Sequence, residues 1–162
     1  MDEFLALAYA KERALPVTIV RLFNTVGPRQ TGRYGMVLPR FIAAAKAGEP
    51  LKVYGDGEQS RCFCHVLDTV EALVLVQNSP AARGEVFNIG SEEEISIVAL
   101  ARLVIETLGS KSKIEFVPYE KAYAPGFDDM RRRKPVVKKL ERVTGFKPAT
   151  TLREIIRLTA SV

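Results

Sequence analysis

The sequence is poor in residues that mark several common functional classes. Its 162 residues include no tryptophan, two cysteines and one histidine. Cys62 and Cys64 lie two positions apart beside His65, and two thiols without a second pair make neither a zinc site nor a disulfide framework. We therefore expect no metal site and no thiol nucleophile, but packed side chains in a reduced, cytoplasmic setting.

Long apolar runs are also missing, and the longest stretch is far too short to span a membrane. The chain opens on Met1-Asp2-Glu3, which is acidic where a signal peptide would be basic. The net charge is +5, and much of the excess lies in the run RRRK at 131–134. No aromatic residue interleaves this run and no nucleic-acid motif accompanies it. The run is therefore either a solvated helix start or an anion site for phosphates, and we expect no nucleic acid and no membrane as partners.

What is present is a regular alternation of helical and extended patterns, which predicts an α/β fold with mainly parallel strands. The predicted strands are 17–23, 51–54, 60–66, 86–90 and 114–117. The predicted helices are 2–14, 36–47, 68–78, 97–108, 136–143 and 152–160. Prolines and glycines at 118–135 predict a loop there. Asp68 and Thr151 each open a capping-box pattern, so both are expected to cap a helix.

The segment 17–23 is nearly continuously apolar, as a strand covered on both faces requires. It ends at Asn24, before Gly27 and Pro28 break the pattern. In open α/β sheets, ligands bind just beyond the carboxyl ends of the strands. We therefore expect Asn24 to meet a ligand.

Short motifs follow one another along almost the whole chain. They are RLFNTVGP at 21–28, VLPRF at 37–41, LKVYGDG at 51–57, QSRCF at 59–63, FNIG at 87–90, DDMRRRKP at 128–135 and GFKP at 145–148. In this order they resemble the carboxyl-terminal half of the extended short-chain dehydrogenases/reductases, the NAD-dependent epimerase/dehydratase family. Within this family, the motifs most resemble those of UDP-glucuronate decarboxylases and UDP-glucose 4-epimerase-like proteins. The resemblance implies an incomplete NAD(P)-binding Rossmann-type fold, in which residues 1–162 form the substrate-binding part and the amino-terminal cofactor-binding part is absent.

The resemblance also implies a set of residues that bind a UDP-sugar, namely Asn24, Val37, Leu38, Lys52, Tyr54, Arg61 and Arg133. Asn24, Arg61 and Arg133 resemble the groups that meet the diphosphate. Guanidinium groups suit this role because they bind phosphate oxygens bidentately.

The other residues of the set would serve the nucleoside. Tyr54 resembles the aromatic residue near the uracil, since an aromatic face suits a flat pyrimidine. Lys52 lies on the same short strand, whose backbone would meet the base edge. Val37 and Leu38 resemble wall residues beside the nucleotide.

Each of these residues also has a plainer explanation. Asn24 could simply close a turn after its strand. Arg61 could pair with a carboxylate of the turn at 55–58. Tyr54 is a residue that half-buried strands favour in any case, and Arg133 could be one exposed charge in a run.

The family's chemistry needs two features that the sequence lacks. One is the glycine-rich loop that holds the NAD pyrophosphate, because Gly55-Asp-Gly57 has no third glycine and no βαβ unit after it. The other is the Tyr-x-x-x-Lys pair, because no tyrosine has a lysine four residues on. We therefore expect no catalytic residue in this chain, and we expect NAD in the complete enzyme, with most of the NAD site absent from this chain.

The leading hypothesis is the UDP-sugar-binding half of an NAD-dependent epimerase, dehydratase or decarboxylase, an isomerase or lyase that is inert without its other half. The chain would then be a truncated product, a cloned fragment or one partner of a split enzyme. The alternatives are a stand-alone nucleotide-sugar-binding module and a non-binding remnant that associates with full-length relatives. Expected partners are a UDP-sugar and either a separate amino-terminal half or a second copy. The residues leave open which sugar nucleotide is bound.

Overall fold

Pairs of short parallel strands organise the molecule, which is α/β as predicted. The computed structural model describes residues 1–32, 36–122 and 130–161. The parallel pairs are β1 (Ile19–Leu22) with β6 (Val86–Ile89), β2 (Thr25–Val26) with β5 (Cys64–His65), and β3 (Leu51–Tyr54) with β8 (Ile114–Val117). A three-stranded sheet has β4 (Ser60–Cys62) at its centre, antiparallel to β7 (Glu94–Ser96) and parallel to β9 (Arg132–Arg133). The expected predominance of parallel pairing is confirmed.

Helices connect and cover these strands. They are α1 (Asp2–Arg13), α2 (Val37–Ala47), α3 (Val66–Asn78), α4 (Ile97–Leu108), α5 (Tyr119–Ala122), α6 (Lys138–Thr144) and α7 (Leu152–Ala160), with a 3₁₀ turn at Pro80–Ala82. Local chemistry sets several of their ends. Ser96 Oγ accepts a hydrogen bond from the amide of Ala99 at the start of α4. Thr151 and Glu154 form the predicted capping box of α7.

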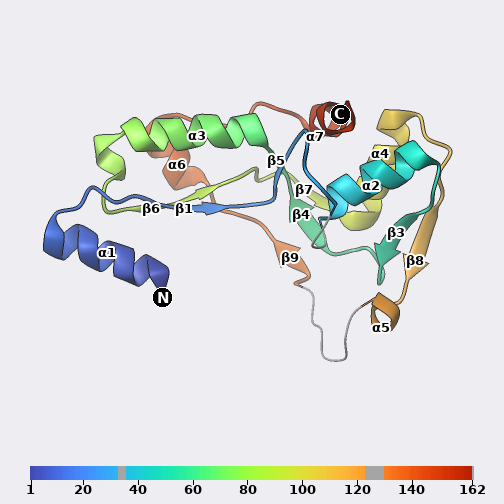
Figure 1. The fold of residues 1–162 in the computed structure, drawn as a ribbon, viewed down its shortest axis with the longest axis horizontal. Coiled ribbons are helices and arrows are strands. Elements are labelled where there is room, and N and C mark those ends of the chain that lie inside the picture. The colour runs from blue at the N-terminus through green and yellow to red at the C-terminus, as the bar shows by residue number, and fades with distance from the viewer. Residues whose placement is uncertain (33–35, 123–129, 162) are drawn as a thin grey trace.

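The buried side chains form two separate hydrophobic cores. One core joins α2, β3, α4 and α7, and its fully buried members include Leu38, Leu51, Leu100 and Ile156. The other joins α3, β6 and α6 around Phe87, Ile89 and Leu140. Figure 1 shows the two groups of elements along the long axis of the molecule, with β4, β7 and β9 between them. The molecule therefore has two lobes, joined by the three-stranded sheet.

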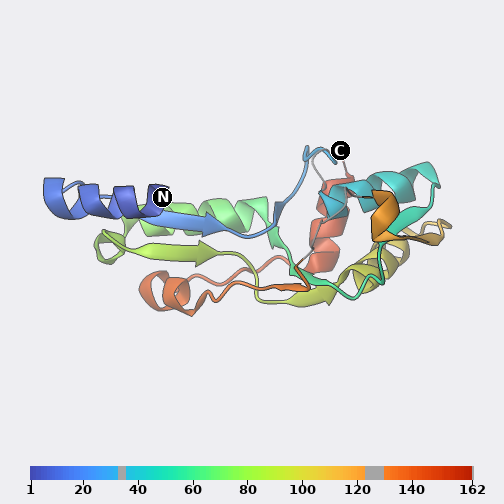
Figure 2. The ribbon, with the colours of Figure 1, turned by 90° about the horizontal axis from the view of Figure 1, so that it is seen from below.

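One edge of β1 is unpaired within the described residues, because β6 is its only partner in a two-stranded sheet. α1 lies on the face of this sheet opposite α3 (Figures 1 and 2). No residue of α1 is buried, and the helix is tied to β1 by a bidentate ion pair in which Arg21 Nε lies 2.7 Å from Glu3 Oε1. Leu22 is 46% exposed, so the strand is not covered on both faces as its sequence predicts.

The prediction that Asp68 caps a helix is wrong. α3 begins two residues earlier, and its N-cap is His65, whose Nδ1 accepts a hydrogen bond from the amide of Leu67. The buried carboxylate of Asp68 instead accepts two hydrogen bonds from Thr150, one from the backbone amide (3.1 Å) and one from the hydroxyl (3.0 Å). Asp68 therefore ties α3 to the segment that precedes α7.

Other differences concern short strands and the loop. The predicted strand 60–66 is divided into β4 and β5, and β2, β7 and β9 were not predicted. The segment 118–135 contains α5 and β9 as well as loop. Tyr34, Tyr123 and the residues 128–129 of the DDMRRRKP motif lie outside the described residues. No helix in the described part of the chain has both the length and the apolarity needed to cross a membrane.

Candidate functional site

Arg61 and Arg133 lie opposite each other on neighbouring strands. In the parallel pairing of β4 with β9, Arg61 is the register partner of Arg133, and Ser60 is the partner of Arg132. Register partners project to the same face of a sheet, whereas successive residues of a strand project to opposite faces. Two of the three residues predicted to meet a diphosphate are thus side by side on one face.

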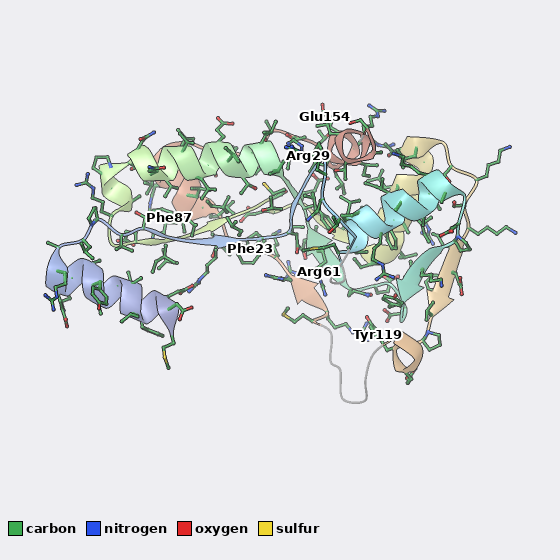
Figure 3. All side chains as sticks on the ribbon, viewed as in Figure 1. Phe23, Arg29, Arg61, Phe87, Tyr119 and Glu154 are labelled. Carbon is green, nitrogen blue, oxygen red and sulfur yellow. The ribbon has the colours of Figure 1, made fainter. Side chains whose placement is uncertain are left out.

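Phe23 connects this pair to the end of β1. The guanidinium carbon of Arg133 lies 5.3 Å from the centroid of the Phe23 ring, within the range of a cation–π contact. Phe23 directly precedes Asn24, so Arg133 is held at the carboxyl end of β1, where a ligand is expected. In Figure 3, Phe23 and Arg61 lie where the two lobes meet.

Asn24 lies at the same place but already has structural partners. Its Nδ2 donates a 2.7 Å hydrogen bond to the carbonyl oxygen of Cys62, and its own carbonyl accepts from the amide of Cys64 at 3.2 Å. Its φ of 38° is in the left-handed region, which asparagine tolerates better than most residues. These hydrogen bonds tie the end of β1 to the β4–β5 segment instead of closing a local turn, and the contact of Asn24 with a ligand stays a prediction.

The four basic residues at 131–134 contact different partners. Arg131 pairs with Asp56 at 2.9 Å, while Arg132 and Lys134 both pair with Glu94. Arg133 has no carboxylate partner within the described part of the chain and contacts the Phe23 ring instead. Arg133 therefore differs from its three basic neighbours, each of which pairs with a carboxylate.

Arg61 is held by backbone carbonyl groups. Its Nη1 donates to the carbonyl oxygens of Ser60 and Met130, each at 2.8 Å. The Met130 contact links Arg61 to the segment that carries Arg133. Asp56, one carboxylate of the turn considered as a partner for Arg61, pairs with Arg131 and caps the amide of Glu58.

Tyr54 and Lys52 alternate with the buried residues Leu51 and Val53 on β3, so they share the outer face of that strand. The Tyr54 hydroxyl accepts a 2.6 Å hydrogen bond from Arg40 Nη2, and the Arg40 guanidinium carbon lies 5.2 Å from the ring centroid. One face of the aromatic ring expected near a uracil is thus covered by Arg40, a residue that the sequence reasoning missed.

Gln59 and Tyr119 were also missed. Gln59 is 6% exposed, and its Nε2 donates to the Tyr119 hydroxyl (2.9 Å) and to the Tyr54 carbonyl oxygen (3.3 Å). The Tyr119 ring lies so close to Gly55 that a Cβ there would come within 2.1 Å of it, and Gly55 also has a φ of 65°. This glycine is therefore required for the contact between α5 and the end of β3.

Val37 and Leu38 begin α2. Leu38 is fully buried in the larger core, and Val37 is half-buried and packs against that core. The Leu38 side chain can support a nucleotide site only from beneath, whereas Val37 keeps some exposed surface. Their predicted role as wall residues stays a prediction.

Cys62, Cys64 and His65 are packed residues, as expected. All three are at most 3% exposed, and burial raises the pKa of the Cys62 thiol to about 11. Burial also raises the pKa of Cys64. Thiols of this kind are inert at neutral pH because little thiolate forms. Among the described residues, no group of three or more histidine, cysteine or acidic side chains is arranged to hold a metal ion.

Comparison with known proteins agrees with this architecture. The parallel strands and their covering helices define a protein of the Rossmann-type α/β class, related to sugar-nucleotide epimerases and dehydratases of known structure. Residues 1–90 match the model of the NAD dependent epimerase/dehydratase family. The chain belongs to this family, as its motifs indicate.

The similar proteins are longer than this chain. UDP-N-acetyl-alpha-D-glucosaminuronate decarboxylase of Bacillus cytotoxicus is 48% identical over 149 residues, which are 91% of this chain and 46% of that protein. UDP-glucuronic acid decarboxylase 1 of Xenopus tropicalis is 39% identical over 152 residues, covering 94% of this chain and 34% of the relative. UDP-glucuronic acid 4-epimerase of Bacillus cereus, solved with UDP-glucuronic acid and NAD, superposes with a TM-score of 0.84 at 26% identity. That superposition covers 98% of this chain and 48% of the epimerase. The chain thus spans less than half the length of these relatives.

Proposed function

We propose that this chain is the nucleotide-sugar-binding part of an NAD-dependent enzyme that acts on UDP-sugars, a decarboxylase, epimerase or dehydratase. The observation that carries the proposal is the register pairing of Arg61 with Arg133 on one face of the β4–β9 pair. Two guanidinium groups side by side on one face suit the two phosphates of a diphosphate, because each can bind phosphate oxygens bidentately.

The surroundings of the pair suit the same ligand. The Arg133 guanidinium stacks on Phe23, the residue that precedes Asn24 at the end of β1. A planar guanidinium binds phosphate oxygens bidentately, and an amide adds hydrogen bonding without adding charge. Tyr54 and Lys52, on the outer face of β3, would then take the nucleobase end, with Val37 beside it.

The described residues do not form the pyrophosphate site that NAD requires. Such a site needs a glycine-rich turn from a strand to an open helix amino-terminus. Two described helices directly follow strands, and neither turn is glycine-rich: the N-cap residues are His65 for α3 and Ser96 for α4. We therefore assign most of the NAD site to a part of the complete enzyme outside residues 1–162, and we assign no step of the reaction to residues of this chain.

The surface around β1 suits contact with such a part. The open edge of β1 can pair with another parallel strand, and α1 would then cover that strand with Phe4, Leu5 and Tyr9, which are 80%, 58% and 48% exposed. On this proposal, residues 1–162 are the carboxyl-terminal, substrate-binding part, and the cofactor-binding part docks on α1 and β1. The gene sequence would show whether the cofactor-binding part belongs to the same polypeptide chain or to a separate one.

Calorimetric titration of the purified chain with UDP and UDP-glucuronate tests the proposal. We expect binding by the wild-type chain, and a roughly 10- to 100-fold weaker affinity for Arg61→Ala and for Arg133→Ala, since a hydrogen bond to a charged group contributes about 1.5–3 kcal/mol. Arg153→Ala is the matched control, because it removes one guanidinium from α7, where Arg153 pairs with Glu106. Absence of binding by a folded wild-type chain, or equal losses in all three variants, would overturn the proposal.

A further inference from the structure

Glu94 lies at the centre of a cluster on the β7–β4–β9 sheet, on the face opposite Arg61 and Arg133. Its carboxylate accepts two hydrogen bonds from Arg132, from Nε and Nη2, both at 2.7 Å. It also accepts one from the Ser60 hydroxyl at 3.0 Å, and Lys134 Nζ lies 3.4 Å away. The side chain is 24% exposed, so these contacts are partly shielded from water.

The register of the three strands places this cluster back to back with Arg61 and Arg133. Ser60 is opposite Arg132 in β9, and Cys62 is opposite Glu94 in β7. Because residues i and i+2 of a strand share a face, Ser60, Glu94 and Arg132 lie together on one face. Arg61 and Arg133 lie on the other.

This arrangement adds to the other contacts that hold the strand pair, namely the Arg61–Met130 and Arg131–Asp56 contacts and the hydrogen bond from the Ser60 amide to the Arg131 carbonyl oxygen (2.9 Å). β9 is two residues long, and all four of the basic residues around it are exposed. A slip of one residue would exchange the faces of Arg132 and Arg133. Such a slip would break the bidentate Arg132–Glu94 pair, so Glu94 favours one register over the other.

We propose that Glu94 is a positioning residue for the arginine pair: by binding Ser60 and Arg132 on one face, it sets the register of β9 that presents Arg133 beside Arg61 on the other. This inference rests on the proposed diphosphate-binding function of that pair. Glu94 itself touches no ligand and acts through Arg132 and the backbone of β9.

The test combines UDP titration with amide hydrogen exchange. Glu94→Gln keeps the shape of the side chain but removes its charge, and Glu93→Gln is the matched control on the exposed neighbouring residue. We expect Glu94→Gln to weaken UDP binding about tenfold and to speed exchange of the Arg132 and Arg133 amides, with Glu93→Gln unchanged in both. A double-mutant cycle gives the readout that a general loss of stability would not mimic. If Glu94 acts through Arg133, the Glu94→Gln/Arg133→Ala variant should bind no more than about twofold weaker than Arg133→Ala alone.

The outcomes separate the two proposals. If the wild-type chain does not bind UDP, the diphosphate site fails, and with it the positioning role. If Arg133→Ala binds UDP more weakly than the wild-type chain, but Glu94→Gln matches the wild-type chain, only the positioning role is overturned. Fully additive losses in the double variant would also overturn it, because they would show that Glu94 acts independently of Arg133.

Discussion

Gly90 lies directly against Phe23: a Cβ built on Gly90 would be 2.9 Å from the Cβ of Phe23 and 3.3 Å from Cγ of Pro135. Real Cβ atoms do not approach other carbons so closely, and neither neighbour is the far end of a flexible side chain. The close approach seats the ring on which Arg133 stacks. The glycine that follows β6 thus fixes part of the candidate site.

Gly90→Ala is therefore expected to move Phe23 and Pro135 and to destabilise the fold by about 1–3 kcal/mol, the usual cost of overpacking. UDP affinity should fall as well, because Arg133 loses its support. Urea unfolding and calorimetry measure the two effects. Gly84→Ala is the comparison for backbone strain alone, because a Cβ there would meet nothing within 4 Å and Gly84 has a φ of 75°, whereas Gly90 has no positive φ and should be affected by the clash alone. Wild-type stability and affinity in Gly90→Ala would contradict the role assigned to this contact.

The two hydrogen bonds from Thr150 to Asp68 predict a second effect on stability. Asp68→Ala would leave the Thr150 amide without its acceptor, and a hydrogen-bonding group that loses its partner on burial costs about 1–3 kcal/mol. The loss should appear in urea unfolding as a lower midpoint. Asp2→Ala, at the exposed start of α1, is the comparison, and an equal effect of the two substitutions would argue against the Asp68–Thr150 contact.

Glu94 should make the stability depend on acid pH. The hydrogen bonds from Arg132 lower the pKa of this carboxyl from 4.5 to about 2. A carboxyl whose pKa is lower in the folded state contributes stability above its unfolded pKa and loses it as the pH falls through the folded pKa. The difference in melting temperature between the wild-type chain and Glu94→Gln should therefore be largest above pH 5 and should shrink between about pH 4.5 and 2. A constant difference over this range would show that the ionised form of Glu94 is not what stabilises β9.

The open edge of β1 and the exposed side chains of α1 predict self-association of the isolated chain. An unpaired strand beside an apolar surface is a common site of unwanted pairing. Light scattering at increasing concentration should show dimers or larger species, and Phe4→Glu with Tyr9→Glu should reduce them. A clean monomer at high concentration would contradict this prediction.

The sequence predicted those parts of the fold that depend on local chemistry. β3 and β8 have the predicted bounds, and α4 lies between the predicted Ser96 cap and Gly109. Thr151 and Glu154 form the predicted box because the two residues are one helical turn apart. Each of these features is decided by residues within a few positions of one another.

Features decided by distant residues were missed or misassigned. Asp68 carries a capping pattern, but its partner Thr150 is 82 positions away. β9 consists of two arginines, and nothing in their local sequence indicates a strand. Their pairing with β4 depends on Glu94, 38 positions earlier.

The residues of the candidate site also depend on distant contacts more than on local sequence. Arg61 and Arg133 were identified by resemblance to a family, because neither position is distinguished by its neighbours in sequence. Their register pairing appears only in three dimensions. Arg40, Gln59 and Tyr119, which surround Tyr54, were missed because each is an ordinary polar residue until the contacts are seen.

The two hydrophobic cores are not built from two consecutive stretches of sequence, as the cores of independent domains usually are. The core around Leu38 and Ile156 draws on segments between Val26 and Ala160, and the core around Phe87 and Leu140 draws on segments from Val20 to Phe146 that alternate with these in sequence. Neither lobe is therefore a contiguous segment of the chain that could be expressed alone with its core intact. Removal of α7 would take Leu152, Ile155 and Ile156 from the first core, and truncation within α3 would divide the second. The chain should accordingly unfold in one cooperative transition.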